Sequence, residues 1–377
     1  MSSTRYDAIV IGIGGMGSAT TYHLARRGFD VLGLERFDIP NARGSSHGFT
    51  RIIRLPQYED PAYVPLVRRA LELWNDLDKR CSTRLFNRTG TIDFGPAESD
   101  IFRGARESCE EHDIDHEVLS GAETAERFPG YDIPQEYRAV YQPDGGFLHS
   151  EQCIVAHTEA AHRNGATLRA RERVKEWEAT ASGVHVTTER DVYTAETLLV
   201  TAGAWTGQLL PALDTYLKPE RQVLGWFQPK RPNHFTLDRF PVFVADVPAG
   251  HYYGFPVYEV PGFKLGKFNH RRETGTPAEL AREPTLEDET ILRRFAERYF
   301  PEGPGPTMRL STCMFTNSPD GDFIIDVHPD HENVIIGAGF SGHGFKFATV
   351  VGEVLSELAV SGTTEHPIDL FRLARFE

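Results

Sequence analysis

Residues 6–36 read YDAIVIGIGGMGSATTYHLARRGFDVLGLER, and the fold can be argued outward from them. The apolar run at 7–11 is typical of a short buried strand, and residues 12–17 follow it with the spacing G-x-G-x-x-G. Apolar residues then recur at helical spacing as far as Gly28, which is well placed to end a helix. A second apolar run at 31–34 leads directly into Glu35. This order of strand, glycine turn, helix, strand and acid predicts a dinucleotide-binding unit.

Each glycine of the turn has a physical task. Gly12 permits a tight turn, Gly14 lets the backbone approach a pyrophosphate, and Gly17 lets the helix pack closely against the strand. Unpaired N–H groups at the start of the helix favour phosphate there. Glu35 follows Gly17 by 18 residues and suits the hydrogen bonds of a ribose diol. The spacing alone leaves open whether the dinucleotide is FAD or NAD, and a glycine-rich turn of some other α/β protein is the remaining alternative.

The composition is that of an ordinary globular protein with room for two domains. The chain has 377 residues, of which 40% are hydrophobic and 25% charged, and a formal net charge of −14. That charge argues against nucleic acid or an anionic membrane as a partner. No apolar run approaches the roughly 18 residues of a membrane span, and no secretory signal is visible. We therefore expect a cytoplasmic protein.

Four cysteines are spread along the chain without a close pair, at Cys81, Cys109, Cys153 and Cys313. This spacing predicts no zinc site and no other metal site, and so few cysteines in a long chain argue against a disulfide framework. A reducing compartment is the simpler interpretation.

Beyond the opening unit, helical and strand patterns alternate in blocks. Helices are predicted at 63–80 and 151–165, and strands across 167–200. A small-residue turn at 202–204 follows the last of these strands, and it could approach the dinucleotide or simply pack in the core. Pro, Phe and Tyr dominate 218–308, which indicates short antiparallel strands.

The last 65 residues return to an α/β pattern, with a strand at 334–338, a glycine cluster and a helix. We therefore predict an α/β (α+β, two-domain) fold, with a discontinuous Rossmann-like nucleotide domain and an antiparallel-sheet substrate domain. The predicted segments are 1–88, 148–217 and 314–377 for the nucleotide domain, and 89–147 and 218–313 for the substrate domain.

Six segments carry a family resemblance. They are IVIGIGGMGSA, GSSHGFTRIIR, YYGFP, KLGK, STCMFTNSPDGDFIID and GFSGHGFKF. Together, and in this order, they resemble the monomeric sarcosine oxidase and N-methyl-tryptophan oxidase family, within the D-amino-acid-oxidase-like flavoproteins. The resemblance implies FAD, linked covalently through a thioether between Cys313 and the 8α carbon of the flavin. Without the resemblance, Cys313 would be interpreted as a buried core cysteine.

The resemblance also implies which other residues surround the FAD. The glycine cluster at 339–347 would aim N–H groups at the flavin and stabilise its reduced form. His47 matches a histidine close to the flavin, although an ordinary loop histidine is nearly as good an interpretation. The implied FAD-binding residues are Gly12, Gly14, Gly15, Met16, Gly17, Glu35, Arg36, Ser45, His47, Thr50, Arg51, Val174, Cys313, Gly342, Gly344 and Lys346.

Arg54 and Lys346 match the residues that hold the substrate carboxylate in this family. The planar fork of an arginine can bind both carboxylate oxygens. Arg51 and Arg54 lie three residues apart, so a helical turn would place them on one face. Without the surrounding motifs, the two arginines would be a surface pair and Lys346 a solvated helix lysine.

Lys264 matches the lysine that activates oxygen in this family, because a fixed cation lowers the cost of the negative charge that builds as O2 is reduced. Lys267 is interpreted as an ordinary solvated strand residue. Tyr253 matches a tyrosine of the substrate pocket, and its neighbour Tyr252 would then face the other side of the strand.

One position departs from the family. Four residues after Lys264 the family has a histidine, whereas this chain has Phe268. His270 lies two residues further on and would face the same side of a regular strand, so it is the candidate to substitute in part for that histidine. The change puts sarcosine itself in doubt and favours a bulkier or differently methylated amine.

These observations predict an FAD-dependent amine oxidase that acts on an N-methyl or other secondary or tertiary amino acid. The product imine would be hydrolysed to an amino acid and an aldehyde, with O2 reduced to H2O2. The expected partners are the small-molecule substrate and O2, and the resemblance implies a monomer. The alternatives are a flavin dehydrogenase with another electron acceptor and a catalytically inactive nucleotide-binding protein. An NAD dehydrogenase is disfavoured by the discontinuous domain and the C-terminal glycine cluster.

Overall fold

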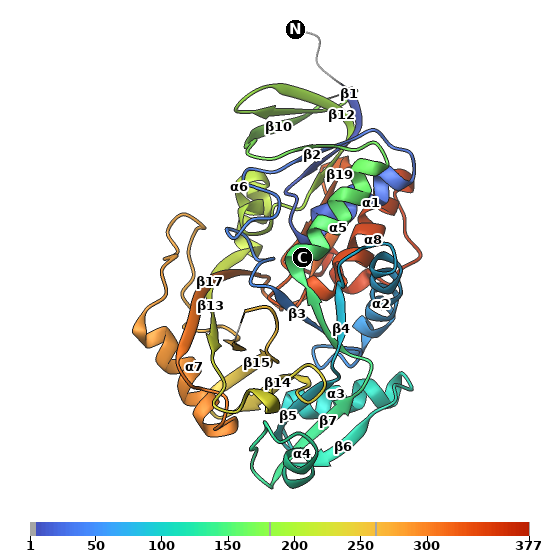
Figure 1. The fold of residues 1–377 in the computed structure, drawn as a ribbon. Coiled ribbons are helices and arrows are strands. Elements are labelled where there is room, and N and C mark those ends of the chain that lie inside the picture. Colours follow the sequence, from blue (N-terminus) through green and yellow to red (C-terminus); the bar gives the residue numbers. More distant parts are fainter. Residues whose placement is uncertain (1–4, 181, 261, 377) are drawn as a thin grey trace.

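The computed structural model describes residues 5–180, 182–260 and 262–376, which form two large sheets, a small third sheet and the helices packed on them (Figure 1). The first sheet, at the top of Figure 1, has a parallel centre in which β12 pairs with β1 and β19, and β1 pairs with β2. Its eight strands are β1 (Arg5–Ile11), β2 (Val31–Leu34), β9 (Thr167–Arg169), β10 (Val174–Thr180), β11 (Gly183–Thr188), β12 (Val192–Val200), β18 (Ile324–His328) and β19 (His331–Ala338).

Alternate side chains of β1 enter different cores, because successive residues of a strand face opposite sides. Val10 belongs to a buried cluster formed with helices, and Ile9 to another formed with the antiparallel strands β10 and β11. The helix side is covered by α1 (Gly15–Arg26), α2 (Val64–Asp78), α5 (Ser150–Arg163) and α8 (Ala348–Ser361). Both faces of the sheet are therefore buried, as expected of a parallel sheet.

The second sheet, in the lower half of Figure 1, is antiparallel except where β14 pairs in parallel with β5. Its strand order is β17-β13-β16-β15-β14-β5-β7-β6. The strands are β5 (Thr91–Pro96), β6 (Glu117–Ser120), β7 (Tyr137–Gln142), β13 (Lys218–Phe227), β14 (Val242–Val247), β15 (Gly250–Phe255), β16 (Phe263–Lys267) and β17 (Thr307–Asn317).

A three-stranded sheet contributes one wall of the site. It contains β3 (Thr50–Ile53), β4 (Phe86–Arg88) and β8 (Gly146–His149), in the order β3-β8-β4. The helical turn considered for residues 50–54 is therefore wrong. Residues 50–53 form a strand, and Arg54 comes after its end.

The predicted fold class is confirmed: a Rossmann-like unit with a parallel centre is joined to a largely antiparallel sheet. Strands of the first sheet come from residues 5–34, 167–200 and 324–338, and those of the second from 91–142 and 218–317. The domain boundaries stay a prediction, and β17 runs continuously across the proposed boundary at 313/314.

Two helices of twelve or more residues were missed in the sequence. These are α3 (Asp100–Glu111) and α7 (Leu286–Tyr299), the second shown in orange in Figure 1. Each begins after a capping residue, because Ser99 accepts from the N–H of Phe102, and Thr285 and Asp288 form a reciprocal capping box. Those caps are the local signal that could have revealed the two helices.

Within the described ranges, no helix is both long and apolar enough to cross a membrane. The same ranges contain no group of three or more His, Cys, Asp or Glu side chains that could hold a metal ion.

Candidate active site

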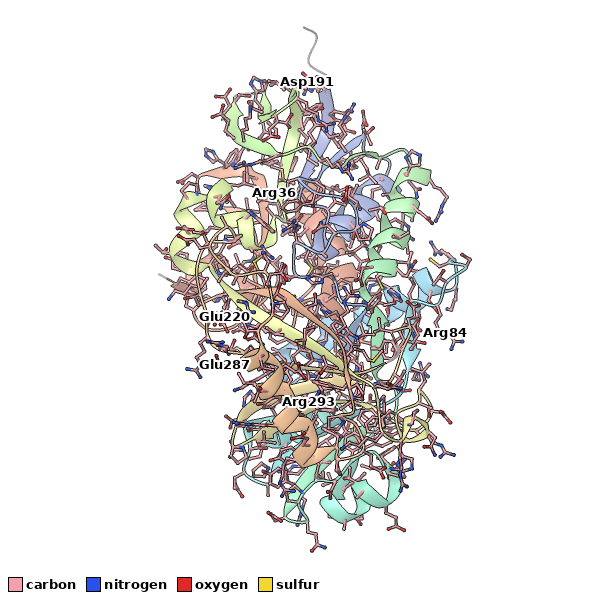
Figure 2. The ribbon with its side chains drawn as sticks, turned by 60° about the vertical axis from the view of Figure 1, so that its left-hand side comes forward. Arg36, Arg84, Asp191, Glu220, Glu287 and Arg293 are labelled. Carbon is pink, nitrogen blue, oxygen red and sulfur yellow. The ribbon has the colours of Figure 1, made fainter. Side chains whose placement is uncertain are left out.

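A first cavity extends along the carboxyl ends of β1 and β2, where a nucleotide binds in an open α/β sheet. Eleven of the predicted FAD-binding residues line it: Gly12, Gly14, Gly15, Met16, Glu35, Arg36, Ser45, Arg51, Val174, Gly342 and Gly344. Side chains fill the space around this cavity, and Figure 2 shows Arg36 in the same upper half of the molecule. The predicted residues that do not line it are Gly17, His47, Thr50, Cys313 and Lys346.

The start of α1 is shaped to receive a ligand. A Cβ at Gly14 would meet only the Ser46 hydroxyl, at 4.0 Å, and the helix has no side-chain cap at this end. A Cβ at Gly17 would lie 1.8 Å from the Gly12 carbonyl oxygen, so helix and strand touch there. Gly12 itself has φ +91°, which disfavours any residue with a side chain. The turn therefore leaves space at Gly14 and excludes side chains at Gly12 and Gly17.

Glu35 is held by backbone donors at the end of β2. Its carboxylate accepts from Ile13 N at 3.0 Å and from Phe37 N at 2.9 Å. Burial raises the pKa of Glu35, and the two backbone hydrogen bonds oppose that rise. The carboxylate thus lines the cavity with its position fixed.

Other residues of this cavity were not predicted. Ser46 accepts a hydrogen bond from the N–H of Gly15 at 3.3 Å. Trp205 packs against the Arg36 guanidinium, which lies 5.0 Å from a Trp205 ring centre. Residues 202–204 line the cavity as well, so the first of the two expectations for that turn describes the structure.

A second cavity adjoins the first, with four lining residues in common: Arg51, Phe315, Gly342 and Phe345. The rest of its wall combines an aromatic side with a charged end. The remaining lining residues are Ile52, Arg54, Glu59, Val244, Tyr253, Phe255, Phe268, Cys313, His343 and Lys346.

The charged end is built around the ion pair of Arg54 and Glu59. Arg54 is 3% exposed and donates to both Glu59 oxygens, at 2.8 and 2.6 Å, and to the Pro56 carbonyl. Its guanidinium lies 4.4 Å from the Tyr58 ring centre. Burial disfavours the charged forms of both residues, but the attraction between Arg54 and Glu59 is stronger than this effect. The pKa of Arg54 is therefore raised and that of Glu59 is lowered. Glu59 was not predicted, and no motif in the sequence pointed to it.

Lys346 is the second cation at this end. It lies in a single 3-10 turn, η5 (Phe345–Phe347), directly before α8, and donates to the His343 carbonyl at 2.8 Å. Burial lowers the pKa of Lys346 to about 7, although the charge of Glu59 opposes this. Lys346 therefore titrates near neutrality.

The aromatic side is formed mainly by edge-to-face contacts. The Phe268 ring lies 4.9 Å from the Tyr253 ring and 5.9 Å from the Phe315 ring. Tyr252 faces the other side of β15, as expected, and stacks on Phe295 at 3.9 Å. Burial raises the pKa of the Tyr253 hydroxyl, so that group keeps its proton at all ordinary pH values.

Cys313 lies in the wall of the second cavity on β17. Its Sγ is 3.8 Å from an Arg51 nitrogen and 3.5 Å from the Ser45 carbonyl oxygen. Because Arg51 and Ser45 line the first cavity as well, the thiol lies where the two cavities meet.

Lys264 is completely enclosed behind this wall. Its Nζ lies 2.8 Å from the Gly48 carbonyl oxygen and from both oxygens of Thr50, and 4.3 Å from the ring centre of Phe255. Burial, together with the charge of Arg51, lowers the pKa of Lys264 well below its usual value. Thr50 is thus a partner of Lys264 and lines neither cavity.

Two predicted histidines do not reach the second cavity. His270 pairs through Nε2 with Asp288 at 3.1 Å, and Arg221 binds the same carboxylate. The strand β16 ends at Lys267, so the alternation expected to place His270 beside Phe268 does not continue. His47 is buried, and burial lowers its pKa to about 4, but it lines neither cavity.

The chain matches the family model described as FAD dependent oxidoreductase over residues 7–358. The chain belongs to the FAD dependent oxidoreductase family. It is 43% identical to monomeric sarcosine oxidase from Bacillus sp. (strain B-0618), over 99% of this chain and 97% of that one. It is 36% identical to N-methyl-L-tryptophan oxidase from Salmonella typhi, over 99% of both chains. The predicted family resemblance is confirmed.

A solved structure supports the same assignment to the FAD dependent oxidoreductase family. NikD, an unusual amino acid oxidase essential for nikkomycin biosynthesis, superposes with a TM-score of 0.85 at 28% identity, covering 98% of both chains. The cofactor of the family fits the first cavity, because Gly14 leaves open space at the start of α1 and Glu35 is fixed at the end of β2. FAD is therefore the dinucleotide, and the alternative of NAD is excluded.

Proposed function

We propose that this FAD-dependent oxidoreductase is an amine oxidase for amino acids with a secondary or tertiary amine. The observation that carries the proposal is the second cavity. It places two buried cations at one end of an aromatic wall, beside the point where it meets the FAD cavity. The relatives named sarcosine oxidase and N-methyl-L-tryptophan oxidase support the same class of substrate.

The substrate carboxylate binds at the charged end in this proposal. Arg54 presents a planar fork suited to two oxygens, and Lys346 adds a second donor. Glu59 occupies the fork in the present structure, so the carboxylate has to share or displace that ion pair. Holding the carboxylate would orient the rest of the amino acid along the aromatic wall.

The aromatic wall favours an apolar N-alkyl group. Phe268 and Phe315 offer only ring carbons, and Tyr253 keeps its proton. No lining side chain on this wall can act as a base for the amine, so the amine has to be bound without its proton. Oxidation should therefore become faster as pH rises through the ionisation of the bound amine.

FAD, when bound, supplies the two-electron oxidation of the C–N bond and the transfer of those electrons to O2. Cys313 would attach it covalently, because its sulfur lies beside Arg51 where the two cavities meet. Burial lowers the pKa of Lys264, and when this side chain is protonated it would provide positive charge behind Phe255 where O2 is reduced. We also propose that the protein acts as a monomer, as the name of its sarcosine-oxidising relatives suggests.

The test starts from the purified, yellow protein. Anaerobic mixing with sarcosine, N,N-dimethylglycine, N-methyl-tryptophan, proline or pipecolate should bleach the flavin absorbance with at least one of them. Methylamine and dimethylamine, which lack the carboxylate, should fail at equal concentration. Admission of air should restore the absorbance and release H2O2.

Each contrary result points to a specific alternative. Bleaching that air does not reverse within seconds would indicate a dehydrogenase with another acceptor. Protein purified without any flavin, and unable to bind added FAD, would indicate an inactive nucleotide-binding protein.

A further inference from the structure

Asp93 is an unpaired acid buried beside the second cavity. It lies in the middle of β5, its side chain is 1% exposed, and neither carboxylate oxygen has a hydrogen-bond partner. Glu59, the other acid nearby, receives two hydrogen bonds from Arg54. An ionised carboxylate without a donor is costly to bury, so Asp93 calls for a functional explanation.

The register of the second sheet places Asp93 on the cavity side. Asp93 is opposite Val244 on β14, and Val244 is opposite Tyr253 on β15. Val244 and Tyr253 both line the second cavity. Residues opposite each other in a sheet share a face, so the Asp93 side chain points to that side too. Its neighbours in sequence, Ile92 and Phe94, enter the aromatic core on the other face.

The charged and titratable groups around Asp93 come from four segments of the chain. The groups that interact electrostatically with Asp93 are Arg54, Tyr58 and Glu59 after β3, Lys346 in η5, Cys109 on α3, and Tyr131. Burial raises the pKa of Asp93 to about 6, the charge of Arg54 opposes this, and the charge of Glu59 adds to it. Its neighbours in the sheet, Val244 and Val140, are apolar.

A carboxylate that enters this region changes the charge balance. Without it, Arg54 and Lys346 face two acids, Glu59 and Asp93. With it, three anions share two cations among largely buried side chains. Asp93 is the acid most easily neutralised, because no donor holds its charge.

We propose that Asp93 is a specificity-determining residue that takes up one proton from solvent when a monocarboxylate binds at Arg54 and Lys346. The proton forms an O–H bond on the Asp93 carboxyl, and nothing is oxidised or reduced. Above the pH at which this uptake is possible, the Asp93 charge repels the incoming carboxylate. This inference rests on the proposed function, because it takes the substrate carboxylate to bind at this end of the cavity.

The experiment measures the Kd of methoxyacetate for the holoenzyme at pH 5 and pH 8.5, by calorimetry. This ether is shaped like sarcosine, carries one carboxylate and has no amine to titrate. In Asp93→Asn the Kd should equal the wild-type value at pH 5 and be about tenfold lower than the wild-type value at pH 8.5, since one like charge next to a bound anion shifts binding by about this factor. Lys346 loses its proton at high pH, which weakens binding in both proteins. The quantity compared is therefore the ratio of the Asp93→Asn Kd to the wild-type Kd at each pH.

Asp322→Asn is the matched control. Asp322 is another acid with a raised pKa, but it is only half-buried and accepts a hydrogen bond from the Tyr63 hydroxyl. Its Kd ratio to wild type should be the same at both pH values.

Two outcomes overturn the inference alone. One is a ratio of the Asp93→Asn Kd to the wild-type Kd that is the same at pH 5 and pH 8.5. The other is wild-type binding at pH 6.5 without net proton uptake, measured in two buffers of different ionisation enthalpy, a result that overturns the inference even if the variant fails to fold. If methoxyacetate does not bind to the wild type at either pH, the proposed carboxylate site fails, and the inference fails with it.

Discussion

Cys313 and Arg51 lie where the two cavities meet, and their contact turns an isolated cysteine into a candidate for covalent chemistry. The other described cysteines have no comparable setting. Burial raises the pKa of the Cys81, Cys109 and Cys153 thiols, which disfavours thiolate. The position of Cys313 beside Arg51, where the two cavities meet, is thus what distinguishes it from the other three cysteines.

Replacement of this thiol tests the covalent link. In Cys313→Ser, acid precipitation should leave the yellow pigment in the supernatant, whereas in wild type and in Cys81→Ser it should stay with the polypeptide. The reason is that a hydroxyl has no accessible anionic form at neutral pH to form the bond. Flavin absorbance of the two fractions is the measurement, and pigment released equally from all three proteins would show that the flavin is not covalently held.

At the scale of elements, the turn between β1 and α1 combines two different uses of glycine. Gly17 is needed for packing within the protein, and Gly14 leaves space for the ligand. Single substitutions should therefore separate stability from cofactor binding.

Gly17→Ala should lower the melting temperature of the flavin-free protein and abolish flavin incorporation, because its Cβ would overlap the Gly12 carbonyl oxygen. Gly14→Ala should leave the flavin-free melting temperature within a few degrees of wild type and still reduce flavin incorporation several-fold, since its Cβ enters the ligand's space. The ratio of visible to 280 nm absorbance reports incorporation. Equal loss of stability in the two variants would contradict this division.

The helix α7 was not recognised from the spacing of its apolar residues, but a capping residue marks where it begins. Thr285 accepts from Asp288 N, and Asp288 also binds Arg221 and His270. Thr285→Ala should cost about 1 kcal/mol of unfolding free energy with turnover unchanged. Urea unfolding provides the measurement, and Thr290→Ala, which removes only a bond to the Leu286 carbonyl in the same helix, is the control. If Thr285→Ala loses no more unfolding free energy than Thr290→Ala, the cap does not stabilise the helix.

At the scale of the whole molecule, the helices over the first sheet enclose two neutral histidines. His23 on α1 and His157 on α5 have side-chain Nε2 atoms without a partner, and His157 packs against Trp74. Burial lowers the pKa of each to about 3. At these two positions the folded protein thus binds fewer protons than the unfolded chain between about pH 3 and pH 6.5.

Stability should therefore be full above pH 6.5 and fall as the solution becomes more acidic. Two such histidines cost about 3 kcal/mol by pH 5.5. His157→Gln should reduce the loss of unfolding free energy between pH 7.5 and 5.5 by about 1.4 kcal/mol, the share of one such histidine, whatever its stability at pH 7.5. His162→Gln, at an exposed position of the same helix, should keep the full dependence. Urea unfolding at the two pH values is the measurement, and an unchanged dependence in His157→Gln would assign the acid sensitivity to other groups.

The sequence by itself determined the β1–α1–β2 unit, its glycine turn and the acid at its end, because strand and helix periodicity and the need for glycine are local properties. It also placed Tyr252 and Tyr253 on opposite faces, since alternation holds inside a regular strand. The same rule failed for His270, which lies beyond the end of β16 and is held by Asp288 of α7.

Only the tertiary structure brought Glu59 and Asp93 to Arg54 and Lys346. These four residues come from a loop, a sheet strand and a turn before the last long helix, and no local pattern relates them. Their meeting depends on the register of β5 against β14 and on the docking of one sheet against the other. Charge balance in the site is therefore a property of contacts between distant segments, which periodicity and spacing along one chain do not encode.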